Sequence, residues 1–413
     1  MAAMGGEIEF KGYAPGQGDL LPSYTADALD PSDAAFFVDE VVEGLELGGF
    51  ERRYSGVGER AYPPRMLLKL WLFGAVSGVY SGREIARRLH YDLRFRYLAG
   101  ELRPDFRTIN RFRVTHIEDF REVFRETVKI AREAGLGKLG RVAIDGTKIR
   151  ANTSRSKAMS RGRMLEAEAR LDDEIGQILM QIEEQNAAED DEHGDGDGGG
   201  GLPEELQSRE ARRERIRAAR EQLEREKGER LEDRHQKSFA DPEANVMKTG
   251  EGAFAYCYNA QAAVSEDGII VATELSATPR DDASLEAVLD EVEANTGECP
   301  DLTVADAGYL TEKNLEAMET RGQTCLIATG REGKKPKWPT QPRSQKMQRT
   351  LRLPWAQAAY RHRKTQGERP FAVIKGPMGF KQFMLRREKN TRGEWNLTAA
   401  GFNLKALWQA QLA

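Results

Sequence analysis

The sequence predicts an α/β protein: a mixed sheet with helices on its faces, an all-α region before it and a charged helical insertion within it. Apolar residues recur at helical spacing from Pro63 to Gly135, whereas short strand-like runs begin at Arg141. Residues 152–250, between the first strand-like run and the second, are highly charged and again helical in pattern. With 413 residues, the chain is long enough for two or three domains.

Four segments in the first part of the chain show the spacing of short helices. They are residues 34–47, 65–79, 81–89 and 105–113. Ser81 or Gly82 can cap the third of these helices. Short helices joined by tight turns are compatible with a helix-turn-helix fold.

The same region carries an excess of positive charge. Residues 51–115 contain about 14 Lys and Arg against 6 Asp and Glu, although the whole chain has a net charge of −5. A local excess of this kind favours binding to a polyanion such as DNA. A helical bundle with a solvated arginine face is the alternative. The candidate DNA contacts are Arg83, Arg87, Arg107, Arg111 and Arg113.

Strand and helix signals alternate after residue 141. The first strand is expected at residues 142–144, ending in Asp145 and a turn at Gly146. A half-buried strand and its hairpin partner follow, and then helices and strands in turn. These later elements are expected at residues 254–261, 268–275, 281–294, 302–305, 311–321 and 324–329. This order is found in ribonuclease-H-like domains.

The insertion contains two charged helical patterns, residues 157–184 and 203–234, on either side of an acidic, glycine-rich stretch. We expect a helical hairpin with a flexible acidic tip. The Asp-Gly alternation at residues 194–198 lacks the full ligand pattern of a calcium loop, so a linker is favoured there. The first helix has an apolar stripe formed by Leu165, Leu171, Ile175, Leu179 and Ile182.

Three acidic residues occupy positions suited to a metal-dependent nuclease site. Asp145 and Asp306 each follow a short buried strand, and Glu368 lies on a basic helical stretch. Residues 331–392 contain about 18 Lys and Arg against 3 Asp and Glu, so Glu368 either forms a local ion pair or holds a ligand. Carboxylates that converge on a pair of divalent metals suit the cutting and joining of phosphodiester bonds.

Other classes of site receive no support from the sequence. Cys257, Cys299 and Cys325 form no CxxC pair, so neither a disulfide framework nor a zinc module is indicated. The histidines show no ligand spacing, and there is no Walker P-loop. Residues 1–21 do not resemble a signal peptide, and no apolar run is long enough to span a membrane. We expect a soluble intracellular protein.

Taken in order, the motifs of the chain resemble those of DDE-type transposases of bacterial insertion sequences, in the IS4/IS5-like superfamily and closest to the IS1182 group. The resemblance extends from about residue 50 to Leu407. It is carried by Asp105-Phe106-Arg107-Thr108-Ile109, Asp145-Gly146-Thr147-Lys148, Ser238-Phe239-Ala240-Asp241-Pro242-Glu243-Ala244, Tyr258-Asn259-Ala260-Gln261, Ala305-Asp306-Ala307-Gly308-Tyr309 and Glu368-Arg369-Pro370-Phe371-Ala372-Val373-Ile374-Lys375.

The resemblance implies catalytic, metal-binding roles for Asp145, Asp306 and Glu368. The implied cofactor is a pair of Mg²⁺ ions, which Mn²⁺ can replace, held about 3.5–4 Å apart. Glu368 and Lys375 have the family spacing, with Lys375 either a phosphate contact or a surface lysine. Asp241 precedes a proline, and we expect a turn role for it.

The tyrosine and arginine of the family signature are less regular in this chain. Tyr360 and Arg363 have the family spacing to each other. Four residues, however, separate Arg363 from Glu368 where the family has three, so Lys364 remains an alternative basic partner. Arg363 is also a candidate DNA contact.

The implied function is to bind the ends of an insertion sequence, cleave DNA there and join the 3′ ends to target DNA. The partners would be double-stranded DNA and, on DNA, a second copy of the chain, with the insertion helices as a candidate interface. The implied location is the nucleoid. A catalytically inactive DNA-binding repressor and a metal-dependent nuclease that does not join strands are the alternatives.

Four parts of the chain are expected from this reasoning. They are an N-terminal segment (1–50), a helix-turn-helix-like DNA-binding domain (51–138), a ribonuclease-H-like catalytic domain (139–151 and 251–413) and the charged helical hairpin (152–250).

Overall fold

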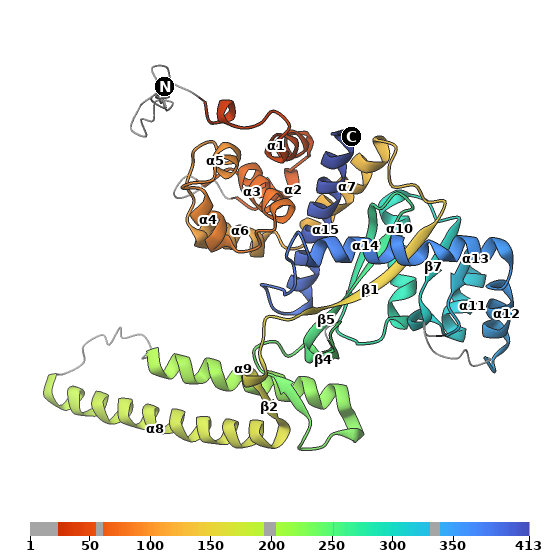
Figure 1. The fold of residues 1–413 in the computed structure, drawn as a ribbon. Coiled ribbons are helices and arrows are strands. Elements are labelled where there is room, and N and C mark those ends of the chain that lie inside the picture. Colours follow the sequence, from red (N-terminus) through yellow and green to blue (C-terminus); the bar gives the residue numbers. More distant parts are fainter. Residues whose placement is uncertain (1–23, 55–60, 194–203, 251, 331–338, 413) are drawn as a thin grey trace, which may run out of the picture.

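A six-stranded mixed sheet lies at the centre of the computed structural model (Figure 1). The structure describes residues 24–54, 61–193, 204–250, 252–330 and 339–412, with the side chains of residues 182–193 left out. The strands run in the order β4–β5–β1–β7–β8, and β6 also pairs with β5. They are β1 (Val142–Arg150), β4 (Asn245–Lys248), β5 (Phe254–Val264), β6 (Ile270–Ser276), β7 (Leu302–Ala305) and β8 (Thr324–Ile327). The predicted α/β class with a mixed sheet is confirmed.

Strand β1 is the centre of this sheet. It pairs antiparallel with β5 along almost its whole length, but parallel with β7 only at residues 142–144. The expectation that the strand ends at Ile144 and turns at Gly146 was therefore wrong. The long strand β5 continues to satisfy the backbone of β1 through Arg150, so no turn forms.

Strand β5 is also more buried than its alternating pattern predicted. Only its first two residues are accessible, and residues 256–264 are buried. The indole N–H of Trp395 donates to the carbonyl of Gln261 at 3.0 Å, and the Tyr309 hydroxyl donates to the side chain of Gln261. Both faces of β5 are covered, so the expected half-buried strand was wrong. The predicted hairpin turn into β6 is present, with Gly268 at φ 90°.

The N-terminal part is all helical, as predicted. Ser81 and Asp105 cap α4 and α6 through their side chains. The helix α3 is so apolar that eleven of its residues are buried. The helices are α1 (Ala34–Gly44), α2 (Gly48–Glu51), α3 (Pro64–Ser77), α4 (Gly82–Arg88), α5 (Leu93–Leu98), α6 (Phe106–Thr115) and α7 (Phe120–Glu133).

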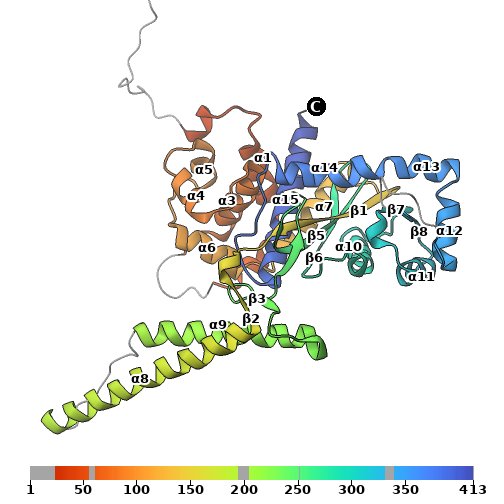
Figure 2. The same ribbon diagram turned by 60° about the horizontal axis from the view of Figure 1, so that its bottom comes forward.

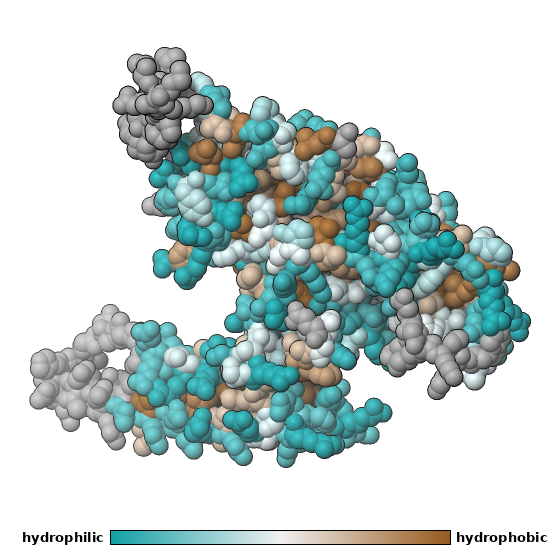
Figure 3. All heavy atoms as spheres, in the orientation of Figure 1, coloured by the Kyte–Doolittle hydropathy of each residue, from teal (hydrophilic) through white to brown (hydrophobic). Residues whose placement is uncertain are grey.

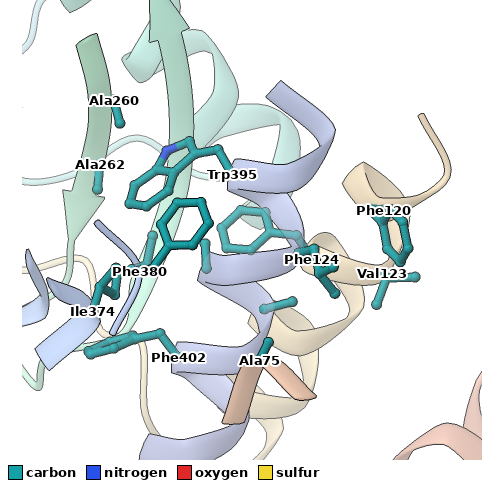
Figure 4. Close-up of a cluster of buried hydrophobic side chains, with 14 of the residues drawn as sticks. Ala75, Phe120, Val123, Phe124, Ala260, Ala262, Ile374, Phe380, Trp395 and Phe402 are labelled. Carbon is teal, nitrogen blue, oxygen red and sulfur yellow. The ribbon is translucent and has the colours of Figure 1, made fainter. Parts of the chain in front are cut away.

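The last helix, α15 (Glu388–Gln411), joins the N-terminal helices to the sheet (Figure 1). It packs on α3, α7 and β6, so a single hydrophobic core runs from Ala34 to Leu407. Figure 4 shows its residues Trp395 and Phe402 close to Phe124 of α7 and Ala75 of α3. Gly401 and Gly393 permit this approach, because a Cβ at either position would overlap Ala75 or Ile117.

One of the predicted DNA contacts belongs to this core. Arg113 was expected on an exposed face, but it is 5% exposed and lies over the ring of Trp71. Its guanidinium is 3.5 Å from the carboxylate of Glu394 on α15, and it donates to the carbonyl of Tyr80. The prediction that Arg113 contacts DNA was therefore wrong. Arg113 is buried and links the N-terminal helices to α15 through its ion pair.

The charged insertion forms the expected helical hairpin, which projects away from the sheet (Figures 1 and 2). Its helices are α8 (Arg161–His193) and α9 (Glu204–Lys227), and the short strands β2 (Ala158–Ser160) and β3 (Gln236–Ser238) pair at its base. The hairpin has its own small core, formed by Met164, Ala167, Leu171, Ile216 and Ala219.

The predicted apolar stripe of α8 was partly wrong. Leu171 and Ile175 are buried as expected, whereas Leu165 and Leu179 are each 40% exposed. Met164 and Ala167 point into the hairpin instead, because one partner helix covers only a narrow seam. The acidic segment at residues 194–198 lies outside the described residues.

The remaining helices of the sheet-containing part are α10 to α14. Thr311 caps α11 by accepting a hydrogen bond from the amide of Asn314, as its position predicted. Among the described residues, no helix combines the length and the apolar character that crossing a membrane requires. The helices are α10 (Leu285–Thr296), α11 (Glu312–Thr320), α12 (Pro342–Thr350), α13 (Pro354–Arg361) and α14 (Arg363–Lys375).

The close packing of α15 on α3 is testable through Gly401. Gly401→Leu should lower the free energy of unfolding by about 2–3 kcal/mol, because the new side chain overfills a tightly packed contact. Thermal unfolding followed by circular dichroism measures this change. Gly176→Ala is the control, since nothing lies within 4 Å of that position on α8 and alanine favours helix. Equal stability of Gly401→Leu and the wild type would contradict the packing described.

Candidate active site

The two aspartates lie at the same level of the sheet. Ile144 of β1 is opposite Ala305 of β7. The residues that follow these two are Asp145, still in β1, and Asp306, just beyond the end of β7. Strand β7 ends at this point, which leaves the side of β1 next to Asp145 open. Ligands of α/β sheets commonly bind beyond such strand ends.

Asp306 is held by the turn that follows β7. Its carboxylate accepts a hydrogen bond from the amide of Gly308 at 2.7 Å and so caps a short 3-10 turn. The turn is anchored by Tyr309, which is 1% exposed and donates to Gln261 of β5. Burial raises the pKa of Tyr309 well above its ordinary value, so its hydroxyl stays protonated.

Helix α14 brings Glu368 to the same place. Gly367 packs directly on β1, because a Cβ there would lie 3.2 Å from the Cβ of Asp145. Gln366 fixes the helix, since its amide nitrogen donates to the carbonyls of Arg141 and Val264 at 2.9 and 2.8 Å. Glu368 follows on the exposed side, where its side chain is 51% accessible against 14% for Asp145.

Arg363 lies between two of these carboxylates. Its guanidinium is 3.9 Å from Asp145 and 4.0 Å from Glu368, and its side chain is 11% exposed. The expected tyrosine accompanies it: Tyr360 donates to the carbonyl of Ala305 at 3.2 Å, and Arg363 lies over its ring. The structure therefore brings Tyr360 and Arg363 to the predicted site despite their irregular spacing from Glu368.

The environment of Asp145 opposes its negative charge. Burial raises the pKa of Asp145 to about 6, partly offset by the amide of Gly146 and by Arg363. The negative charges of Asp306 and Glu368 contribute to this raised pKa through charge repulsion, so both carboxylates act on Asp145. A carboxylate with a perturbed pKa beside like charges is typical of a functional site.

Lys375, a predicted phosphate contact, is bonded within the protein. Its ammonium group donates to the hydroxyl of Thr147 and, at 3.1 Å, to the carbonyl of Lys148. Both partners belong to β1. These bonds attach the end of α14 to the strand that carries Asp145.

A polar network on the opposite face of β1 was not predicted. Asp281 accepts hydrogen bonds from Lys148, Asn259 and Gln261 at 2.7–2.9 Å. Gln261 in turn accepts from Tyr309, so the network supports the turn that holds Asp306. The motifs that contain Lys148 and Asn259 carry the family resemblance, but their spacing gives no sign that Asp281 joins them.

Three hard carboxylate oxygen donors suit a divalent cation such as Mg²⁺. Within the described residues, however, no three His, Cys, Asp or Glu side chains are grouped closely enough to hold a metal ion. The guanidinium of Arg363 lies between Asp145 and Glu368, where its positive charge offsets the negative charges of the two carboxylates. The donor chemistry fits a metal, provided that Arg363 and the exposed Glu368 side chain rearrange.

Two family models match the chain. Residues 210–404 match the transposase DDE domain, and residues 24–115 match a transposase domain of the type DUF772. The chain belongs to the DDE transposases. No curated protein and no solved structure gave a match.

The match to the DDE domain includes only two of the three predicted catalytic residues of this transposase. Asp306 and Glu368 lie inside the DDE match, whereas Asp145 precedes it and is separated from it by part of the insertion. The sheet register and the contact with α14 therefore support Asp145 as a residue of the site. A transposase DDE domain implies transposition, and such transposases typically use divalent metals.

The N-terminal match contains the remaining predicted DNA contacts. Arg83, Arg87, Arg107 and Arg111 are exposed, on α4 and α6. Arg87 pairs with Glu84 on its own helix at 2.8 Å, and Arg83 lies over the ring of Phe106. Their role in binding DNA stays a prediction.

The burial of Asp145 can be tested in metal-free buffer. Its raised pKa means that the ionised form destabilises the fold, and this cost appears as the pH rises through about 6. Asp145→Asn should therefore raise the free energy of unfolding at pH 8 by about 2 kcal/mol, with the gain vanishing near pH 4. Denaturant unfolding at both pH values measures it. Asp301→Asn, at an exposed position before β7, is the control. A destabilised Asp145→Asn at pH 8 would contradict this account.

Proposed function

We propose that this transposase binds the ends of its insertion sequence, cleaves DNA there and joins the 3′ ends to target DNA by two-metal phosphoryl transfer. The observation that carries the proposal is the convergence of Asp145, Asp306 and Glu368 from β1, the end of β7 and α14. Assignment to the IS1182 group rests on the sequence motifs alone.

Each carboxylate has a distinct setting in the proposed site. Asp145 is a rigid ligand, held on the central strand under α14. Asp306 is oriented by the amide of Gly308, and Glu368 is the most accessible of the three. Arg363 offsets their mutual repulsion. When bound, Mg²⁺ would activate the attacking oxygen and stabilise the leaving one, and Mn²⁺ can replace it.

The proposed reaction needs no nucleotide energy source. Water attacks the phosphodiester bond at the element end, breaking one P–O bond and leaving a free 3′-hydroxyl. That hydroxyl then attacks a phosphodiester of the target DNA, where one P–O bond forms as another breaks. Carboxylates that hold both oxygens in line contribute mainly positioning and charge compensation.

The two alternatives differ in what the carboxylates do. A repressor that only binds DNA does not need three carboxylates beside an arginine. Keeping Asp145 is also unfavourable for the fold, because burial opposes its charge. A nuclease without joining activity would use the same residues but leave the 3′ end free. Assembly of two copies on paired ends is part of our proposal, with the hairpin of α8 and α9 as the candidate interface.

Strand transfer in vitro tests the proposal. Purified protein is mixed with a labelled end of its own element, a plasmid target and Mg²⁺. We expect joined product with the wild type and a loss of about a thousandfold in Asp145→Ala, Asp306→Ala and Glu368→Ala, because each removes a metal ligand.

Asp301→Ala, which removes an exposed carboxylate close to Asp306 in the chain, should retain full activity. Cleavage without joining would favour the nuclease. Specific binding of the end with neither reaction would favour the repressor.

A further inference from the structure

A groove lies between the helical hairpin and the first turn of α15. One wall is α9, which contributes Arg215 and Arg225. The other wall is the loop that leads into α15, with Arg386 and Arg387. Segment 239–243, from the motif that follows β3, lies between the two walls. All four arginines are exposed.

Two arginines of this groove, Arg215 and Arg386, bond to neutral groups, whereas Arg225 pairs with Glu221 at 4.0 Å. Arg209, Arg213 and Arg220 pair with carboxylates on α8 at 2.7–3.0 Å and hold the two helices together. In the groove, Arg215 donates to the carbonyl of Ala211, and Arg386 donates to the carbonyl of Asn152. Neutral acceptors orient these side chains without cancelling their charge, which suits an anionic ligand.

Two acidic residues beside the groove accept hydrogen bonds from the backbone at the start of α15. Asp241, which is fully buried, accepts hydrogen bonds from the amide of Arg387 at 3.1 Å and from the hydroxyl of Tyr258 at 2.9 Å. Glu243 accepts from the amide of Glu388 at 2.5 Å. The predicted turn motif therefore anchors the start of α15.

Arg387 has a backbone conformation that non-glycine residues rarely adopt, with φ 70°. Such a conformation is unfavourable for a non-glycine residue and persists only where the surroundings impose it. Here the bond to Asp241 holds it in place. Strained residues of this kind are concentrated at ligand-binding segments.

We propose that this groove binds the phosphate backbone of double-stranded DNA beyond the point of cleavage. The inference rests on the proposed function, because it needs DNA to enter at Asp145. Asn152 lines the groove seven residues after Asp145, and an extended chain of that length spans about 23 Å. DNA that reaches both places would extend over about seven base pairs.

The surface around the groove agrees with this path. Figure 3 shows a wide, mainly hydrophilic notch between the N-terminal helices and the hairpin. The exposed Arg107 and Arg111 of α6 belong to the domain on the other side of the notch. A duplex in the notch would therefore lie between the groove and the helical domain that carries these two arginines.

The test is direct binding of a fluorescein-labelled duplex of about 30 base pairs, followed by anisotropy at several salt concentrations without divalent metal. Arg215→Gln combined with Arg386→Gln removes one charge from each wall. We expect binding to weaken about tenfold, and the slope of log K against log salt to fall by about two. Arg170→Gln combined with Arg234→Gln removes two exposed charges that face carboxylates, and it should keep the wild-type slope.

The DNA-binding role of the groove and the proposed strand-transfer function are tested independently. A wild-type slope in the Arg215→Gln, Arg386→Gln variant would overturn the groove, whatever the strand-transfer assay gives. An equal loss in the Arg170→Gln, Arg234→Gln control would also overturn it, because a general effect of charge would then explain the result.

Discussion

The parallel register of β1 with β7 is the constraint on which the site depends. Because Ile144 is opposite Ala305, the residues that follow, Asp145 and Asp306, lie side by side where β7 stops. Strand β1 continues on its other edge through pairing with β5, so Asp145 stands on a rigid strand. A shift of one residue would turn Asp145 to the opposite face, towards the network of Asp281.

Helix packing then completes the arrangement from distant parts of the chain. Gly367 lets α14 rest on Asp145, and Gln366 and Lys375 tie the helix to β1 and β5. Helix α15 packs on the sheet and on the N-terminal helices, and the buried pair of Arg113 and Glu394 joins them. The loop that leads into α15 carries two arginines of the groove, so this part of the chain links the core, the N-terminal helices and the proposed DNA path.

Much of this could be predicted from local patterns. The α/β class, the helical N-terminal part, the hairpin and the caps at Ser81 and Thr311 follow from periodicity and short-range chemistry. The continuation of β1 past Gly146 could not be predicted in this way, because it depends on pairing with β5, which lies beyond the long insertion in the sequence. The same holds for Arg113, whose burial depends on contact with α15.

The candidate site shows the same division. Asp145 and Asp306 were predicted from strand-like runs that end in an aspartate, Glu368 from its place on a basic helical stretch, and the motif order linked them. Asp281 was missed because its partners come from β1 and β5, and no spacing in its own segment reveals them. The groove was missed for a similar reason: α9 and the start of α15 meet only in the folded chain.

The central claim is that Asp145, Asp306 and Glu368 share divalent metal. Anomalous diffraction from crystals of the protein with Mn²⁺ tests it most directly, because the ions are located without reference to activity. The account predicts Mn²⁺ beside all three carboxylates, with Arg363 moved away from Asp145 and Glu368. Mn²⁺ bound elsewhere, with Arg363 still between those two side chains, would contradict it.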